Sequence, residues 1–353
     1  MIAIGIFFIV RRHRYLSIWI ILMLIIGFAF IMKGGDWFVE AAVWIAEVTN
    51  IPKIIIGATI VSLATTLPEL FVSLFAVVGG SAGLGIGNAI GSIICNTGLI
   101  LAISLIVSPL IVKKRIVLTK GLLLIIAILI LVFVAWDHTI KPIESIYLFA
   151  VLFVFVLYNI RSVKKTKDTK PIVLLSEEKE IRHINTDKRS IIINVLKFIV
   201  GAGCIIIGAN LLVDNGIIIA SFLGVSETVI GLTVIAFGTS LPELVTIIMS
   251  LIKKHGDMGI GNILGANILN ITLVLGTCSA VSETGLVLPN ESGGLAINIP
   301  RILAIDIPVV LLMLSVLLVP LLFNNQNKLK RIQGVVLLAI YFGYISMLLI
   351  SSL

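Results

Sequence analysis

Charged residues are scarce in this chain of 353 residues, because Asp, Glu, Lys and Arg together make up 12% of it. A soluble domain carries about twice that share, so no soluble domain is expected. The three cysteines show no CxxC spacing, and the four histidines are scattered among the predicted loops. Neither a disulfide framework nor a cysteine or histidine metal site is therefore expected.

Hydrophobic residues fill 59% of the chain, and its mean hydropathy is +1.20. Runs of about 20 apolar residues, the length that crosses the hydrocarbon layer as a helix, recur along the whole chain. Ten spans are predicted, near residues 16–46, 53–79, 84–110, 116–136, 142–160, 191–220, 226–252, 257–282, 302–323 and 332–352. We therefore expect an all-α, multi-pass integral membrane protein of the cell (plasma) membrane.

One long polar stretch, residues 161–190, separates the first five spans from the last five. It divides the chain into an N-terminal extension (1–15), a first half (16–160), a cytoplasmic linker (161–190) and a second half (191–353). With this linker in the cytoplasm, the positive-inside rule is met by most basic loops, for example those of Lys113 and Lys253. The net charge of +8 therefore indicates orientation in the bilayer rather than binding to nucleic acid. The basic residues of the N-terminal extension are the exception, because this topology puts them outside.

The two halves of the chain repeat one another. A shift of 174 residues, from Gly57 to Gly231, aligns GATIVSLATTLPEL with GLTVIAFGTSLPEL without a gap. The same shift aligns GIGNAIGSIICN with GIGNILGANILN. Each half holds an odd number of spans, so the second half must enter the membrane from the opposite side. The predicted fold is thus ten transmembrane helices arranged as two inverted five-helix repeats.

An LPE motif interrupts one apolar span in each half. Thr66 with Glu69, and Ser240 with Glu243, have the spacing of a capping box at a helix start. Proline suits the first turn of a helix and not its interior, so one half-helix is expected to end before each motif and another to begin there. A break at membrane depth is tolerated where the backbone lines protein or a wet cavity.

The two glutamates favour ion binding over capping alone. A carboxylate at the bilayer centre costs about 2.5–3.5 kcal/mol, and glutamine would cap nearly as well. Hard cations prefer oxygen ligands, and each half supplies a set of them. The expected ligands are the carboxylates of Glu69 and Glu243, the hydroxyls of Thr65, Thr66, Thr239, Ser240 and Ser92, the amides of Asn96 and Asn270, and carbonyls near Ser62 and Ala236.

Small and polar residues of the following span have a less certain role. The spacing of Gly261 and Gly265 favours close helix approach. Asn88 and Asn262 are either interhelical hydrogen-bond partners or ligands of an outer site, and packing is slightly favoured.

The duplicated motifs resemble the α-repeats of the sodium/calcium exchanger branch of the cation/calcium antiporter superfamily, and the resemblance covers nearly the whole chain. It implies a ten-span antiporter whose central ion sites are lined by both repeats and exchange Na⁺ for Ca²⁺ by alternating access. By position, Glu69 and Glu243 match the paired calcium-binding carboxylates of the family, and the threonines and serines match its sodium and calcium ligands. The implied partners are Ca²⁺, Na⁺ and the lipid bilayer, with no cofactor beyond the transported ions.

Departures from the family pattern leave one alternative open. Ala266 stands where a serine is common, and Asn270 where an aspartate is frequent. An antiporter of Ca²⁺ or another divalent cation against H⁺ could use the same glutamates as proton carriers. A channel is less expected, because filters usually form rings from several subunits. An enzyme is not expected, because no nucleophile and base accompany the glutamates.

Overall fold

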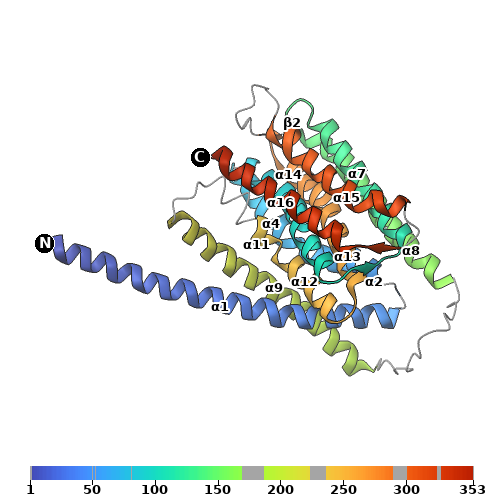
Figure 1. Cartoon of the computed structure of the whole chain (residues 1–353), viewed down its shortest axis with the longest axis horizontal. Coiled ribbons are helices and arrows are strands. Elements are labelled where there is room, and N and C mark those ends of the chain that lie inside the picture. The colour runs from blue at the N-terminus through green and yellow to red at the C-terminus, as the bar shows by residue number, and fades with distance from the viewer. Residues whose placement is uncertain are drawn as a thin grey trace.

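Helices make up nearly all of the computed structural model, which describes residues 2–49, 51, 53–80, 82–168, 187–222, 236–288, 300–323 and 327–352. The helices of the first half are α1 (Ile2–Thr49), α2 (Lys53–Ile56), η1 (Gly57–Val61), α3 (Ser62–Thr65), α4 (Leu67–Val78), α5 (Ala82–Cys95), η2 (Asn96–Leu101), α6 (Ala102–Val107), α7 (Lys114–Val134), η3 (Pro142–Glu144) and α8 (Ser145–Asp168). Those of the second half are α9 (Lys188–Phe222), α11 (Ala236–Thr239), α12 (Leu241–Ile252), α13 (Gly256–Leu269), η5 (Asn270–Leu275), α14 (Gly276–Val281), η6 (Ile302–Asp306), α15 (Ile307–Phe323) and α16 (Arg331–Ser352). Figure 1 shows them packed as one bundle.

The predicted all-α membrane fold is confirmed. Within the described residues, nine helices or helical runs are long and apolar enough to cross a membrane. The predicted span over residues 226–252 is described from residue 236 onward, as α11 and α12, and its earlier part lies outside the described residues. The division into four parts stays a prediction. Helix α1 starts at Ile2 and runs through the predicted extension, and its N-terminal end projects beyond the bundle in Figure 1.

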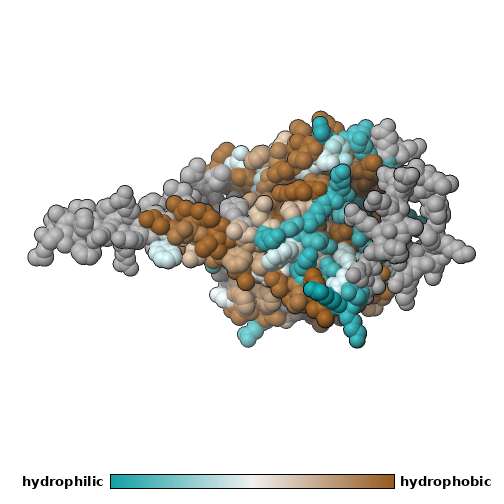
Figure 2. Space-filling model, turned by 90° about the horizontal axis from the view of Figure 1, so that it is seen from below, coloured by the Kyte–Doolittle hydropathy of each residue, from teal (hydrophilic) through white to brown (hydrophobic). Residues whose placement is uncertain are grey.

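Helices α5 and α13 form the buried centre of the bundle, whereas α1 and α9 lie at its periphery. Large apolar side chains remain exposed on the outer helices, among them Trp19 on α1 and Phe133 on α7. The face shown in Figure 2 is accordingly brown over much of its area, with the teal residues gathered toward one end. This distribution is expected where lipid, rather than water, surrounds the helices.

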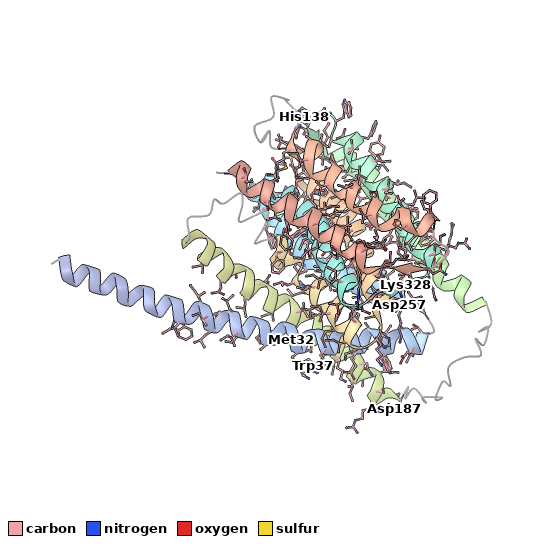
Figure 3. The ribbon with its side chains drawn as sticks, in the orientation of Figure 1. Met32, Trp37, His138, Asp187, Asp257 and Lys328 are labelled. Carbon is pink, nitrogen blue, oxygen red and sulfur yellow. The ribbon has the colours of Figure 1, made fainter. Side chains whose placement is uncertain are left out.

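Short antiparallel strands join the two halves at opposite ends of the bundle. At one end β1 (Leu110–Ile111) pairs with β4 (Lys328–Leu329), and at the other β2 (Thr139–Ile140) pairs with β3 (Leu286–Val287). Figure 3 places His138, which precedes β2, far from Lys328 of β4. The loops after the third and ninth predicted spans therefore share one side, as the positive-inside argument requires.

Helix α13 of the second half packs closely against α2 and η1 of the first half. A Cβ atom on Gly265 would lie 2.8 Å from Cα of Ala58, and one on Gly261 would overlap the main-chain carbonyl of Ile54. The interpretation of these two glycines as close-approach positions is confirmed. The second span of one half thus lies directly on the third span of the other.

Helices α1 and α9, which begin the two halves, pack side by side. The ring centroids of Phe38 and Phe198 are 4.6 Å apart, and Lys197 Nζ lies 3.0 Å from Glu40 Oε1. One ion pair joins α1 to the end of α12, with Lys253 Nζ 2.7 Å from Asp36 Oδ1. Helix α1 therefore contacts both α9 and the C-terminal end of α12.

Candidate ion-binding site

The predicted helix breaks occur at equivalent positions in the two halves. Helix α3 ends and α4 begins on either side of Thr66, and α11 ends and α12 begins on either side of Ser240. The backbone angles of Thr66 (φ −82°, ψ −4°) nearly equal those of Ser240 (φ −84°, ψ 2°). The interruption is one residue wide, so the chain keeps its direction across it. Pro68 and Pro242 have no backbone N–H, so in each half the main-chain carbonyl four residues earlier lacks its usual helical donor.

The capping-box prediction is wrong. Among the described residues, neither the hydroxyls of Thr66 and Ser240 nor the carboxylates of Glu69 and Glu243 have a hydrogen-bond partner. Backbone amides across the break are already satisfied by backbone carbonyls, because Thr66 N–H donates to Ser62 O at 2.9 Å and Leu70 N–H to Thr66 O at 3.0 Å. The Thr66 amide, which the Glu69 carboxylate would have capped, therefore already has a partner.

The carbonyls near the helix breaks, Ser62 O and Ala236 O, were predicted to be freed by the breaks, but each still accepts one backbone hydrogen bond. Each accepts the amide of the residue four positions on, from Thr66 at 2.9 Å and from Ser240 at 3.2 Å. A carbonyl oxygen has two lone pairs, so one remains for a further partner.

All eleven predicted ligand residues are at most 2% exposed. They lie on the two interrupted spans, on α5 and its continuation η2, and on η5. Glu69 and Glu243 are both 0% exposed, and their charges repel one another. In the described part of the chain no basic side chain forms an ion pair with either carboxylate. The two halves therefore bring two buried carboxyl groups together, with no basic partner in the part of the chain that the structure describes.

Unpartnered polar atoms concentrate at this site. Among the described residues, eleven buried side-chain nitrogen and oxygen atoms lack a hydrogen-bond partner, and ten of them belong to Thr66, Glu69, Asn96, Ser240, Glu243, Asn262 and Asn270. Eight of those ten are oxygens. Each such buried group costs about 1–3 kcal/mol when it is left unsatisfied. A cluster of buried oxygens that all lack a hydrogen-bond donor is suited to binding a cation.

Two hydrogen bonds cross between the halves in a symmetric pattern. Thr65 Oγ1 donates to Asn262 Oδ1 at 3.3 Å, and Thr239 Oγ1 donates to Asn88 Oδ1 at 3.1 Å. The threonines occupy equivalent positions of the repeat, and so do the asparagines. Asn88 and Asn262, whose role the sequence left open, are therefore interhelical hydrogen-bond partners. Ser92 Oγ also lies 3.4 Å from Thr239 Oγ1.

A fifth asparagine at the site, Asn267, was missed by sequence reasoning. Asn96 Nδ2 donates to Asn267 Oδ1 at 3.1 Å, and Asn267 Nδ2 donates to Thr97 Oγ1 at 2.8 Å. This chain of bonds engages the amide nitrogen of Asn96 and leaves its oxygen unpartnered. The shift of 174 residues puts Asn267 opposite Ile93, so a search for matched residues passes over it. Asn267 could have been found by another signal, because it is a polar side chain inside an otherwise apolar predicted span.

Comparisons of the whole chain with known proteins all lead to one family. The sequence profile described as sodium/calcium exchanger protein matches residues 19–161 and 193–350. An uncharacterized membrane protein of Methanocaldococcus jannaschii is 35% identical over 319 residues, which cover 90% of this chain and 94% of the relative. The sodium/calcium exchanger MaX1 of Methanosarcina acetivorans is 28% identical over 356 residues, covering 93% and 97%.

Solved structures show the same similarity at the level of the fold. The sodium-calcium exchanger NCX_Mj, soaked with Na⁺ and Sr²⁺, superposes with a TM-score of 0.74 at 30% identity, over 93% of this chain and 98% of that one. The same exchanger at zero Na⁺ and Ca²⁺ gives a TM-score of 0.73 at 32% identity, over 94% and 99%. The likeness therefore extends over nearly the whole of both chains.

Proposed function

Because the chain belongs to the sodium/calcium exchanger protein family, we propose that it exchanges Na⁺ for Ca²⁺ across the cell membrane by alternating access, with Glu69 and Glu243 at the centre of the transport site. One observation carries the proposal. The two carboxylates are fully buried, come from inverted halves and have no protein partner in the described residues.

The charge of these carboxylates explains why transport is an exchange. Two negative charges are neutralised by one Ca²⁺ or by two Na⁺, and a neutral site can pass through a low-dielectric barrier. The empty site carries two uncompensated charges, so its passage is opposed. Asn270 adds no charge, although its side-chain oxygen and nitrogen both lack a partner among the residues that the structure describes. A third Na⁺ would make each cycle carry one net charge, which the membrane potential drives by about 2.3 kcal/mol per 100 mV.

The remaining ligands of the proposed site are neutral oxygens. The hydroxyls are those of Thr65, Thr66, Thr239, Ser240 and Ser92, the amide oxygens are those of Asn96 and Asn270, and the carbonyls are those of Ser62 and Ala236. Hydroxyl and carbonyl oxygens suit both ions, because Ca²⁺ and Na⁺ are hard cations. Ala266 supplies no hydroxyl, so the two halves offer unequal sets. Alternation would move α1 and α9 together across the central helices.

Sodium is proposed as the counter-ion because relatives of this chain are named sodium/calcium exchangers. The test is ⁴⁵Ca²⁺ uptake into proteoliposomes of the purified chain, driven in turn by an outward Na⁺ gradient and by an outward H⁺ gradient. Uptake is expected with the Na⁺ gradient and at background level with the H⁺ gradient alone. Uptake that follows the H⁺ gradient in the absence of Na⁺ would instead make the chain a Ca²⁺/H⁺ antiporter.

The glutamates are tested in the same vesicles. Glu69→Gln and Glu243→Gln are each expected to abolish Na⁺-driven uptake, because one carboxylate cannot balance a divalent ion. Glu283→Gln is the matched control, since Glu283 is an exposed loop residue. Near-normal uptake by either Glu69→Gln or Glu243→Gln would show that the two carboxylates have a structural role and do not bind the transported ion.

A further inference from the structure

We propose that Asn88 and Asn262 are positioning residues of the transport site, each of which accepts the hydroxyl proton of a threonine in the opposite half. Asn88 acts on Thr239 and Asn262 acts on Thr65. The proposal rests on the proposed function, because it assumes that the threonines and the neighbouring carbonyls bind the transported ion.

The hydroxyl proton of each threonine can go to an asparagine of the opposite half or to a main-chain carbonyl of its own span, and Thr239 has a third, more distant neighbour in Ser92 Oγ at 3.4 Å. Thr239 Oγ1 lies 3.1 Å from Asn88 Oδ1 and 3.3 Å from Ala236 O. A hydroxyl has one proton and two lone pairs, and a cation can use only the lone pairs. Donation to Asn88 therefore sends the proton toward the neighbouring helix α5 and leaves the lone pairs of the hydroxyl for an ion.

The other half repeats this choice. Thr65 Oγ1 lies 3.3 Å from Asn262 Oδ1 and 3.4 Å from Ser62 O. In both halves the asparagine is the nearer acceptor. The alternative acceptor is in each case a main-chain carbonyl three residues earlier in the same span.

The choice of acceptor also decides whether these carbonyls can bind an ion. One lone pair of Ala236 O is taken by Ser240 N–H at 3.2 Å, and one of Ser62 O by Thr66 N–H at 2.9 Å. If the threonine proton took the second lone pair, the carbonyl would have none left. Each asparagine thus keeps two oxygens available, the hydroxyl of the threonine and the carbonyl beside it.

The two positioning residues differ in how they are anchored. Asn88 Nδ2 donates to Ser73 Oγ at 3.0 Å and to Glu69 O at 3.3 Å, which fixes the direction of its amide oxygen. Asn262 Nδ2 has no partner among the described residues, and Ile247 occupies the repeat position that corresponds to Ser73. Asn88 is therefore the more firmly held of the two, and its loss is expected to have the larger effect.

Double-mutant cycles on Na⁺-driven ⁴⁵Ca²⁺ uptake in proteoliposomes test this assignment. Asn88→Leu, which keeps the shape and removes the acceptor, is expected to raise the half-saturating Ca²⁺ concentration about three- to ten-fold, the effect of one lost hydrogen bond. In a Thr239→Val background the same change is expected to have less than about a 1.5-fold effect, because its target is already gone. Asn262→Leu should behave in the same way toward Thr65→Val.

The pseudo-symmetry of the chain supplies the control. Asn88 with Thr65, and Asn262 with Thr239, are pairs of the same residue types that share no hydrogen bond, so their effects should combine additively. Asn88→Ala and Asn262→Ala replace any leucine variant that does not purify as a folded protein by size-exclusion chromatography. A general packing role would lower yield or maximal rate and would not distinguish crossed from uncrossed pairs.

The outcomes separate this proposal from the proposed function. Additive effects in the crossed pairs, or equal coupling in crossed and uncrossed pairs, would overturn the assignment of Asn88 and Asn262 while Thr65 and Thr239 remain ligands. If Thr65→Val and Thr239→Val leave the half-saturating concentrations of both Ca²⁺ and Na⁺ unchanged, the ligand set itself is refuted, and this inference with it.

Discussion

Replacement of Glu69 by glutamine should stabilise the ion-free protein while it destroys transport. Both central carboxylates are 0% exposed and have no hydrogen-bond partner in the described part of the chain. An unsatisfied buried polar group costs about 1–3 kcal/mol, and a charged one costs more. Glu69→Gln keeps the shape of the side chain and removes one of two charges that repel each other. We therefore expect the ion-free variant to be more stable than the ion-free wild type by about 1–3 kcal/mol.

Calcium should reverse the comparison. A ligand that binds only the folded state stabilises it by RT ln(1 + [L]/Kd), which is about 2.7 kcal/mol at a concentration one hundred times Kd. The wild type gains this amount, whereas the variant, with one carboxylate, gains little. At saturating Ca²⁺ the wild type should therefore be at least as stable as the variant, although it is the less stable of the two in a chelator.

Thermal unfolding in detergent measures both effects, with samples in chelator and in a Ca²⁺ titration. Glu283→Gln, on an exposed loop, should follow the wild type under both conditions. Two results would refute the reasoning. The first is an ion-free Glu69→Gln protein that unfolds below the wild type, and the second is a variant that Ca²⁺ stabilises as much as the wild type.

Three further changes probe other parts of the structure. Asn267→Leu removes the acceptor that holds the Asn96 amide and should raise the half-saturating Ca²⁺ concentration for transport about two- to ten-fold. An unchanged concentration would mean that Asn267 only packs against its neighbours and does not position Asn96. Gly261→Ala introduces a Cβ atom against the facing helix, so thermal unfolding should show that its free energy of unfolding falls by about 1–3 kcal/mol. In the control variant Gly203→Ala the new Cβ atom meets nothing within 4 Å, so the free energy of unfolding should rise slightly. Burial and a neighbouring lysine lower the pKa of His255, so stability should fall as pH drops below about 6.5, and His255→Gln should remove that part of the pH dependence.

The repeat explains why so much of the architecture could be predicted. One constant shift pairs Glu69 with Glu243 and Thr65 with Thr239, and an odd number of spans per half then inverts one copy relative to the other. These steps need only hydropathy and register, which lie in the printed order of residues. The helical membrane fold followed from them and is confirmed. The ligand set also came from this pairing and remains a prediction.

The hydrogen-bond partners could not be predicted, because they depend on packing between the halves. The sequence suggests a capping box at Thr66 and Glu69, but the backbone continues so nearly as a helix that the Thr66 amide already donates to Ser62 O. Asn267 has Ile93 as its repeat counterpart, so symmetry offers no reason to select it. Its importance appears only when α13 is placed against η2 and its amide is found between Asn96 and Thr97.

The crossed bonds between Thr65 and Asn262 and between Thr239 and Asn88 have an evolutionary consequence. A half-length chain inserted in both orientations would already contain a threonine and an asparagine at these positions. Two such molecules, associated as an antiparallel homodimer, could form both bonds with identical sequences. Gene fusion would then have preserved this pairing without requiring a new residue and would have left the two copies free to diverge, and the repeat positions of Ser92 and Ala266 do differ.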